Sequence, residues 1–280
     1  VVKMLTDYRS HQKMLSTYVD GWEVYMVGSS LFLGTKLHGT VTGRYSSRLH
    51  QVPRDGIIRN LIEAPEGWTF IQGDLSQAEL RVIAIVSQDP ELTRCYNEGI
   101  DVHWRTTIGV LRLGGSAADL EMVRSTVTKD RGDCDGMNMA AMLDYLENMG
   151  PDAAIAIDKR WKEKRKQSKG INFGYVYGMG ANKFCEYAKL RYEWEVTHHE
   201  SSNIREGFFG TYEGLNPWHD RQRAMVKIDG FVRSLSGRKR RLPGIWSPDR
   251  MVKAEAERQA INSPVQGFIG DLKVMGMLSI

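Results

Sequence analysis

RKQSKGINFGYVYG, residues 165–178, carries charged and aromatic side chains at a regular interval of four: Arg165, Lys169, Phe173 and Tyr177. At 3.6 residues per turn, this spacing predicts a helical stripe roughly 18 Å long. Two cations followed by two rings suit a triphosphate continued by a sugar and a flat base, because the charges bind phosphate oxygens and the rings stack on the base. Considered alone, the pattern fits a basic helix with one end in a core equally well.

A second informative stretch is WTFIQGDLSQAELRVIAIVSQD, residues 68–89. Trp68 to Gly73 predicts a short β-strand, and the apolar spacing after it predicts a helix. Asp74 lies where the strand gives way to the helix, which is a usual position for a metal-binding carboxylate facing a cleft. Glu79 has a structural explanation, because residues 76–79 fit the capping-box pattern of a helix N-terminus. Asp74 has no such explanation.

Composition places the chain among globular proteins with phosphate-binding potential. It has 280 residues, is 41% hydrophobic and carries a formal charge of +4. The charge is uneven: residues 158–170 contain seven basic against two acidic side chains, and residues 238–241 form a basic tetrad. Such clusters are the electrostatic footprint of phosphate binding, although the tetrad by itself fits a solvated face.

The cysteines and the hydropathy pattern exclude other classes. Cys95, Cys134 and Cys185 are odd in number and widely spaced, which excludes a disulfide framework and a structural zinc site. The sequence has neither a signal peptide nor an apolar run long enough to span a bilayer. A reduced protein of the bacterial or phage-infected cytoplasm, with no membrane partner, is expected.

The motifs resemble those of family A DNA polymerases, the group of bacterial DNA polymerase I and many phage replicases. DLSQAELR, residues 74–81, resembles the first catalytic motif, and residues 165–178 resemble the nucleotide-binding finger helix. The resemblance covers most of the chain. Further motifs follow in the family's order: TGRYSS at 42–47, DVHWRT at 101–106, TYEGLNPWHDRQR at 211–223, GRKRRLP at 237–243 and AERQAINSPVQG at 256–267.

The resemblance implies an α+β fold of the right-hand polymerase type, in which a palm of antiparallel sheet and helices holds a helical fingers subdomain. Residues 1–88 would form the end of the thumb and the first part of the palm. Residues 89–245 would form the fingers, and residues 246–280 would return to the palm.

The implied activity is that of a DNA-directed DNA polymerase, with primer-template DNA and dNTPs as partners. Two Mg²⁺ ions would serve phosphoryl transfer to the primer 3′-hydroxyl. Asp74 and the backbone carbonyl of Leu75 would be metal ligands. Lys169 would be catalytic, as a general acid toward pyrophosphate or as a plain charge clamp.

The resemblance also implies which side chains contact the nucleotide and the DNA. Glu79 would pair with the Tyr177 hydroxyl and exclude ribonucleotides. The DNA contacts would read minor-groove acceptors that are shared by all base pairs, whereas Arg258 could also form an ordinary salt bridge with Glu255. The nucleotide-binding residues would be Gln77, Glu79, His103, Arg165, Lys169, Phe173 and Tyr177. The DNA-binding residues would be Arg44, Arg258, Asn262 and Gln266.

Two features depart from the family pattern. Sixty-two positions separate His103 from Arg165, and the extra segment near 107–157 is rich in Met, with four basic against eight acidic residues. It contains no complete calcium loop, and it is expected to elaborate the fingers surface or to bind a replication protein partner. In addition, the family's His-Asp-Glu motif, which would complete the second metal site, does not occur. The sequence is therefore expected to be an internal fragment, inactive or weak by itself.

Three alternatives stay open at this point. A single-subunit RNA polymerase has a related finger helix, but Glu79 and Phe173 favour deoxynucleotides. A non-catalytic module that binds primer-template DNA is a second alternative. An interaction scaffold built around residues 107–157 is the third.

Overall fold

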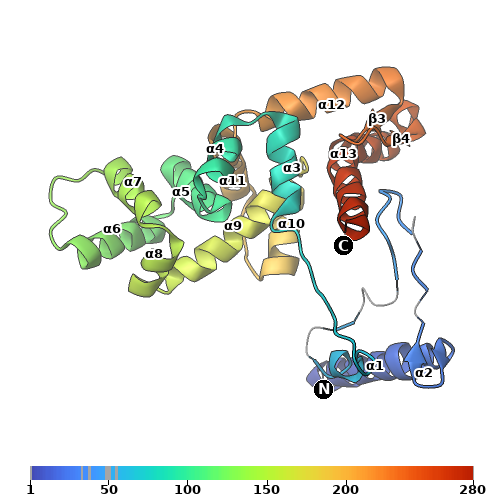
Figure 1. The fold of residues 1–280 in the computed structure, drawn as a ribbon. Coiled ribbons are helices and arrows are strands. Elements are labelled where there is room, and N and C mark those ends of the chain that lie inside the picture. The colour runs from blue at the N-terminus through green and yellow to red at the C-terminus, as the bar shows by residue number, and fades with distance from the viewer. Residues whose placement is uncertain (1, 33, 37–38, 48–51, 54–55, 280) are drawn as a thin grey trace. The chain divides into compact units, whose positions relative to one another are not determined.

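The computed structural model describes residues 2–32, 34–36, 39–47, 52–53 and 56–279. The chain forms two compact units: the first comprises residues 1–76 and 270–280, and the second comprises residues 77–269 (Figure 1). The units are described separately, because their relative placement is not fixed. The assignment of thumb, palm and fingers stays a prediction.

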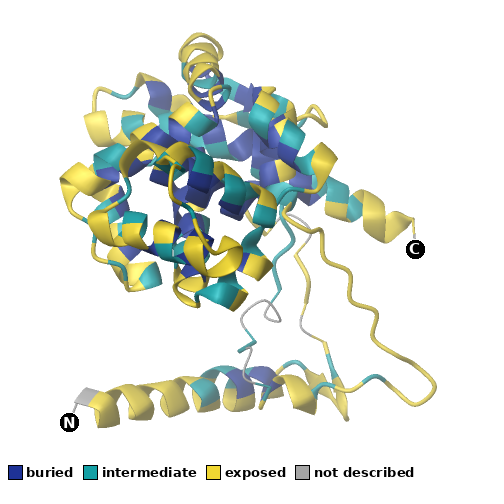
Figure 2. Ribbon diagram, turned by 90° about the vertical axis from the view of Figure 1, so that its left-hand side faces the viewer, coloured by how far each residue is buried: buried dark blue, intermediate teal, exposed yellow. Residues whose placement is uncertain are grey.

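The first unit is small and largely exposed. It contains α1 (Val2–Met14), a π-helical turn (Leu15–Val19), α2 (Asp20–Glu23) and the antiparallel pair β1 (Met26–Val27) and β2 (Ser30–Leu31). A 3-10 turn covers Arg59–Leu61. Tyr18, Trp22 and Ile58 form its buried cluster. Figure 2 shows that most of α1 is exposed, whereas buried residues are concentrated in the second unit.

The predicted strand from Trp68 to Gly73 is wrong. These residues have no regular secondary structure, and the side chains of Trp68, Phe70 and Ile71 are 66–80% exposed. A strand requires a neighbour that accepts and donates its backbone hydrogen bonds. No described segment pairs with these residues.

The second unit is almost entirely helical. Its short hairpin pairs β3 (Phe231–Arg233) with β4 (Lys239–Arg241), and a 3-10 turn covers Pro243–Trp246. The helices are α3 (Ala78–Ser87), α4 (Pro90–Glu98), α5 (Val102–Gly114), α6 (Ala117–Arg131), α7 (Met139–Met149), α8 (Pro151–Ile157), α9 (Arg160–Val176), α10 (Ala181–Tyr192), α11 (His198–Thr211), α12 (Leu215–Asp229) and α13 (Arg250–Leu278), of which the last nine residues group with the first unit.

Helix α9 is central to the second unit, where it contacts α5, α8, α10 and α11 (Figure 1). Tyr175 of α9 stacks on Phe184 of α10, with ring centroids 4.6 Å apart, and packs against Phe208 of α11. An isolated helix with a basic surface would be only marginally stable, so the burial of Tyr175 stabilises α9. The main core also includes residues of α3, α12 and α13.

Residues 107–157 form part of a second core together with α5 and α9. The segment's Met-rich character is explained by this packing, because Met122 and Met142 are buried and three further methionines pack against them. Every residue of this range is described, and Leu113 is the one large hydrophobic side chain of the range that is exposed. Most large hydrophobic side chains of the segment are therefore at least partly buried in this core.

None of the helices in the described ranges combines the length and the apolar character needed to cross a membrane.

Candidate functional site

The helical stripe predicted from the sequence is present on α9. Arg165, Lys169 and Phe173 lie within the helix, and Tyr177 is the residue at which it ends. Gly178 follows with φ = +74°, a backbone conformation that glycine adopts without strain. Phe173 is 42% exposed although its neighbours Asn172 and Gly174 are buried, so its ring is available to a ligand.

The cationic end of the stripe is joined to the start of α5 by Asp101. This carboxylate uses one oxygen to cap α5, accepting from the Trp104 backbone N–H at 2.8 Å. Its other oxygen accepts from the Arg165 guanidinium, with Nε at 3.2 Å and Nη2 closer. Burial raises the pKa of Asp101, but Arg165 and the Trp104 N–H outweigh this effect and hold it below its ordinary value. Lys169, by contrast, has no partner among the described residues.

His103 is held in one orientation by Asn172 of α9. The Asn172 amide nitrogen lies 2.7 Å from Nδ1 of His103, and its oxygen lies 2.8 Å from the Thr106 hydroxyl. Burial lowers the pKa of His103 to about 4. At neutral pH the His103 imidazole is therefore uncharged.

The aromatic end of the stripe contains the predicted pair of Glu79 and Tyr177. The Tyr177 hydroxyl donates to Oε2 of Glu79 at 2.8 Å. Helix α3 begins after Gln77, which has φ = +51° and makes no side-chain capping bond. Gln77 accepts a hydrogen bond from the Tyr96 hydroxyl at 3.1 Å. The capping box at residues 76–79 stays a prediction, and one oxygen of the Glu79 carboxylate binds Tyr177.

A cavity of about 520 Å³ lies beside Tyr177, between the end of α9, the start of α10 and α13. Arg258 and Asn262 of α13 line it, so two DNA-binding candidates and one nucleotide-binding candidate share this space. Oδ1 of Asn262 is buried and has no hydrogen-bond partner among the described residues. Arg258 forms the expected salt bridge with Glu255, with Nε 3.0 Å from Oε2. Gln266 lies one turn further along α13.

Asp74, Leu75 and Arg44 belong to the first unit. Asp74 is exposed, and its side chain has no partner in the described ranges, so its carboxylate is accessible to a cation. No group of three or more potential metal-binding side chains gathers among the described residues. Arg44 lies close to α13: a Cβ added at Gly270 would be 3.7 Å from the Arg44 backbone nitrogen.

Sequence reasoning missed three residues that support the stripe. Asp101 and Asn172 orient Arg165 and His103, as described above. His219 is buried, and its Nε2 donates to the Val176 carbonyl at 2.7 Å, next to Tyr177. Each lies within a motif that the sequence presents, but the contacts join residues 43–69 positions apart and only the fold shows them.

Comparison with known proteins identifies the family. The model of DNA polymerase family A matches residues 1–127 and 153–280. The chain belongs to DNA polymerase family A. Residues 128–152 are outside the match. The segment that departs from the family A pattern is therefore shorter than the predicted segment near 107–157.

Curated relatives extend this similarity over the whole chain. DNA polymerase I, thermostable, of Thermus filiformis is 29% identical over 289 residues, covering 100% of this chain and 29% of its own length. DNA polymerase I of Pseudomonas aeruginosa is 28% identical, covering 99% of this chain and 26% of its own length. The family A chain therefore spans less than a third of either relative.

A solved structure agrees at the level of the fold. The POL domain of Pol1 from M. smegmatis, in complex with DNA primer-template and dNTP, has a TM-score of 0.65 and 22% identity. The match covers 96% of this chain and 40% of that chain. The predicted α+β polymerase fold is confirmed.

Proposed function

We propose that this chain is the nucleotide-binding part of a DNA-directed DNA polymerase, which adds dNTPs to a primer 3′-hydroxyl under the direction of a template. The observation that carries the proposal is the α9 stripe, whose aromatic end is tied to Glu79 at 2.8 Å and whose cationic end adjoins His103. The names of the relatives and the ligands of the Pol1 structure support it.

The triphosphate would bind at the N-terminal half of the stripe. Arg165 and Lys169 supply cations, and the neutral His103 supplies a hydrogen-bonding group without adding charge. The flat ring of Phe173 and that of Tyr177 would contact the sugar and the base. Rings and cations placed in this order match the chemical order of a nucleoside triphosphate.

The duplex would bind at α13. Arg258, Asn262 and Gln266 would donate to minor-groove acceptors that every base pair presents, so the contacts would sense pair shape rather than sequence. The buried Oδ1 of Asn262 has no hydrogen-bond partner among the described residues, which supports a ligand at this place that presents a donor, such as the minor-groove amino group of guanine. Arg44, in the first unit, is a further DNA-binding candidate.

Divalent cations would bind at Asp74. Its accessible carboxylate and the Leu75 carbonyl are hard oxygen donors of the kind that Mg²⁺ prefers. They make an incomplete set, so two Mg²⁺ ions would require further carboxylate ligands. A bound Mg²⁺ would lower the pKa of the primer hydroxyl and neutralise charge on the leaving pyrophosphate.

Primer extension by the complete gene product tests the proposal. Extension that requires Mg²⁺, dNTPs and a template is expected, with DNA affinity that falls steeply as salt is raised. DNA binding without extension would favour the non-catalytic module instead. A preference for ribonucleotides over dNTPs would favour the RNA polymerase alternative.

Replacing Glu79 by Ala is expected to increase ribonucleotide incorporation relative to dNTPs about tenfold. The change removes the carboxylate that fixes the Tyr177 hydroxyl, and with it the wall beside the sugar 2′ position. The measurement is kcat/KM for GTP and dGTP on one template. Tyr177→Phe removes the same bond from the other side, so unchanged discrimination in both variants would exclude this gate.

Replacing Phe173 by Tyr is expected to improve the use of dideoxynucleotides about tenfold or more. The exposed ring of Phe173 has no hydroxyl to substitute for the missing 3′-hydroxyl, whereas a tyrosine supplies one. The ratio of ddTTP to dTTP incorporation measures the effect, with dTTP kinetics as the internal control. Equal ratios in both proteins would contradict the placement of Phe173 at the sugar.

A further inference from the structure

The unmatched segment, residues 128–152, contains all of α7 together with the loop before it and the start of α8. Three α7 side chains, those of Met142, Leu143 and Leu146, are buried in the second core. Trp104 of α5 and Trp161 of α9 belong to the same core and meet edge to face, with centroids 5.2 Å apart. Helix α7 is thus packed against α5, and it shares this core with Trp161 of α9.

The tryptophan pair is adjacent to those side chains in the sequence. Trp104 directly follows His103, and Trp161 lies about one turn before Arg165. The indole N–H of Trp104 donates to the Leu146 carbonyl of α7 at 3.1 Å. A change in the position of α7 therefore acts on the spacing between α5 and α9, and hence on the spacing between His103 and Arg165.

Glu147 of α7 adds an electrostatic connection. Its carboxylate lies 3.4 Å from Arg94 of α4, 3.4 Å from Arg105 of α5 and 3.1 Å from Arg112 of α5. The side chains of Glu147 and Arg105 are only 18% and 15% exposed. Arg105 and Arg94 also pair with Glu91, so loss of the Glu147 charge weakens this network without leaving either arginine unpaired. Arg105 is two residues from His103.

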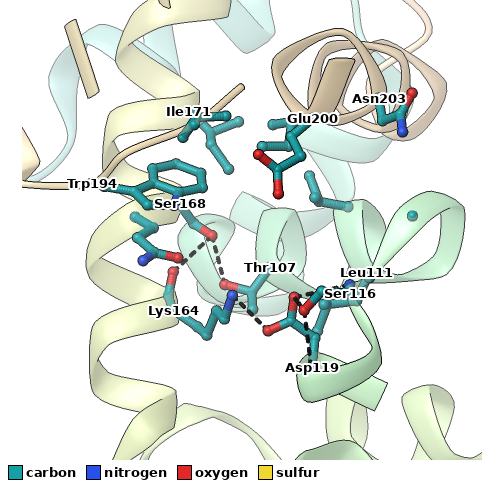
Figure 3. A pocket seen from close by; sticks show the side chains of 16 residues that line it. Thr107, Leu111, Ser116, Asp119, Lys164, Ser168, Ile171, Trp194, Glu200 and Asn203 are labelled. Carbon is teal, nitrogen blue, oxygen red and sulfur yellow. Dashed lines mark hydrogen bonds and ion pairs between the residues drawn. The ribbon is translucent and has the colours of Figure 1, made fainter. Parts of the chain in front are cut away.

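The same face of α9 makes further contacts beyond Trp161 (Figure 3). Lys164 forms an ion pair with Asp119 of α6 at 2.6 Å, and Ser168 is 2.7 Å from the Thr107 hydroxyl of α5. A cavity of about 330 Å³ lies among these residues.

We propose that the unmatched segment is a positioning element for the nucleoside triphosphate. Helix α7 holds α5 and α9 at the spacing at which His103, Arg165 and Lys169 reach one phosphate chain. This inference rests on the proposed function, since it concerns the same nucleotide. It gives residues 128–152 a role in substrate affinity rather than in binding another protein.

Glu147→Gln and Leu146→Ala in the complete polymerase test the inference. We expect the Kd for dGTP, measured with Mg²⁺ and a primer-template, to rise about 5- to 10-fold. The maximal rate at saturating dGTP and the affinity for DNA should change less than about twofold. Asp144→Asn is the matched control, because Asp144 is on the same helix and also contacts Arg112, but it is 61% exposed.

A structural role alone would give a different pattern. Variants that melt at a lower temperature but bind dGTP with wild-type affinity would overturn the positioning role. An equal loss of affinity in Asp144→Asn would also overturn it. If the wild-type protein itself binds no dNTP, the proposed function fails. That result differs from the two outcomes above, in which the wild-type protein binds dGTP.

Discussion

Replacing Asp74 by Asn is expected to lower the rate of dNTP incorporation by the complete polymerase about a thousandfold. Asn keeps the shape of the side chain but removes the negative charge that would hold a divalent cation. Metal stabilisation of charge in the transition state contributes several kcal/mol, and each 1.36 kcal/mol is about a factor of ten in rate. Single-turnover kinetics at saturating dNTP and Mg²⁺ measure the effect.

The affinity for primer-template DNA should change little in this variant, because the proposed duplex contacts are made by other residues. Glu66→Gln is the matched control, since Glu66 is an exposed acid of the same segment, and it should retain the wild-type rate. A rate within tenfold of wild type for Asp74→Asn would remove Asp74 from the metal site.

Replacing Lys169 by Met is expected to lower kcat/KM for dNTPs about 100- to 1000-fold, the range seen when one preorganised donor to a developing charge is removed. Lys169 is half-buried on α9 and has no partner among the described residues, unlike Arg165, which is held by Asp101. Its charge is therefore available to a ligand. Lys166→Met is the control, because Lys166 is 51% exposed and lies 3.6 Å from Glu163.

Lys169→Arg separates the two roles considered for this residue. Arginine keeps the positive charge but does not release a proton. Recovery of most of the activity in Lys169→Arg would indicate a charge clamp, whereas activity as low as that of Lys169→Met would indicate a general acid. Full activity of Lys169→Met would contradict both roles.

The helix and its ligand-facing stripe could be predicted from the sequence, because residues four apart in a helix share a face whatever surrounds them. The contact of Glu79 with Tyr177 was also predictable, but only through the resemblance to a family. The capping-box pattern at residues 76–79 does not conflict with this contact, because the carboxylate has two oxygens and the Tyr177 hydroxyl binds one of them.

Other features depend on contacts that no local pattern encodes. The strand at residues 68–73 did not form, because β-propensity acts only where a partner strand exists. The orientation of His103 depends on Asn172, 69 positions away. The core that α7 shares with Trp104 and Trp161 could not be predicted, because it depends on the relative positions of α5, α7 and α9.

The pairing of Arg165 with Asp101 gives the protein an internal competitor for its own ligand. An incoming anion must share or displace a carboxylate that already accepts from the guanidinium. A singly charged anion gains little from that exchange, whereas a triphosphate that also reaches Lys169 and His103 gains several bonds at once. Chloride and inorganic phosphate would therefore be rejected without any steric barrier, and the length of the phosphate chain would become the property that is selected.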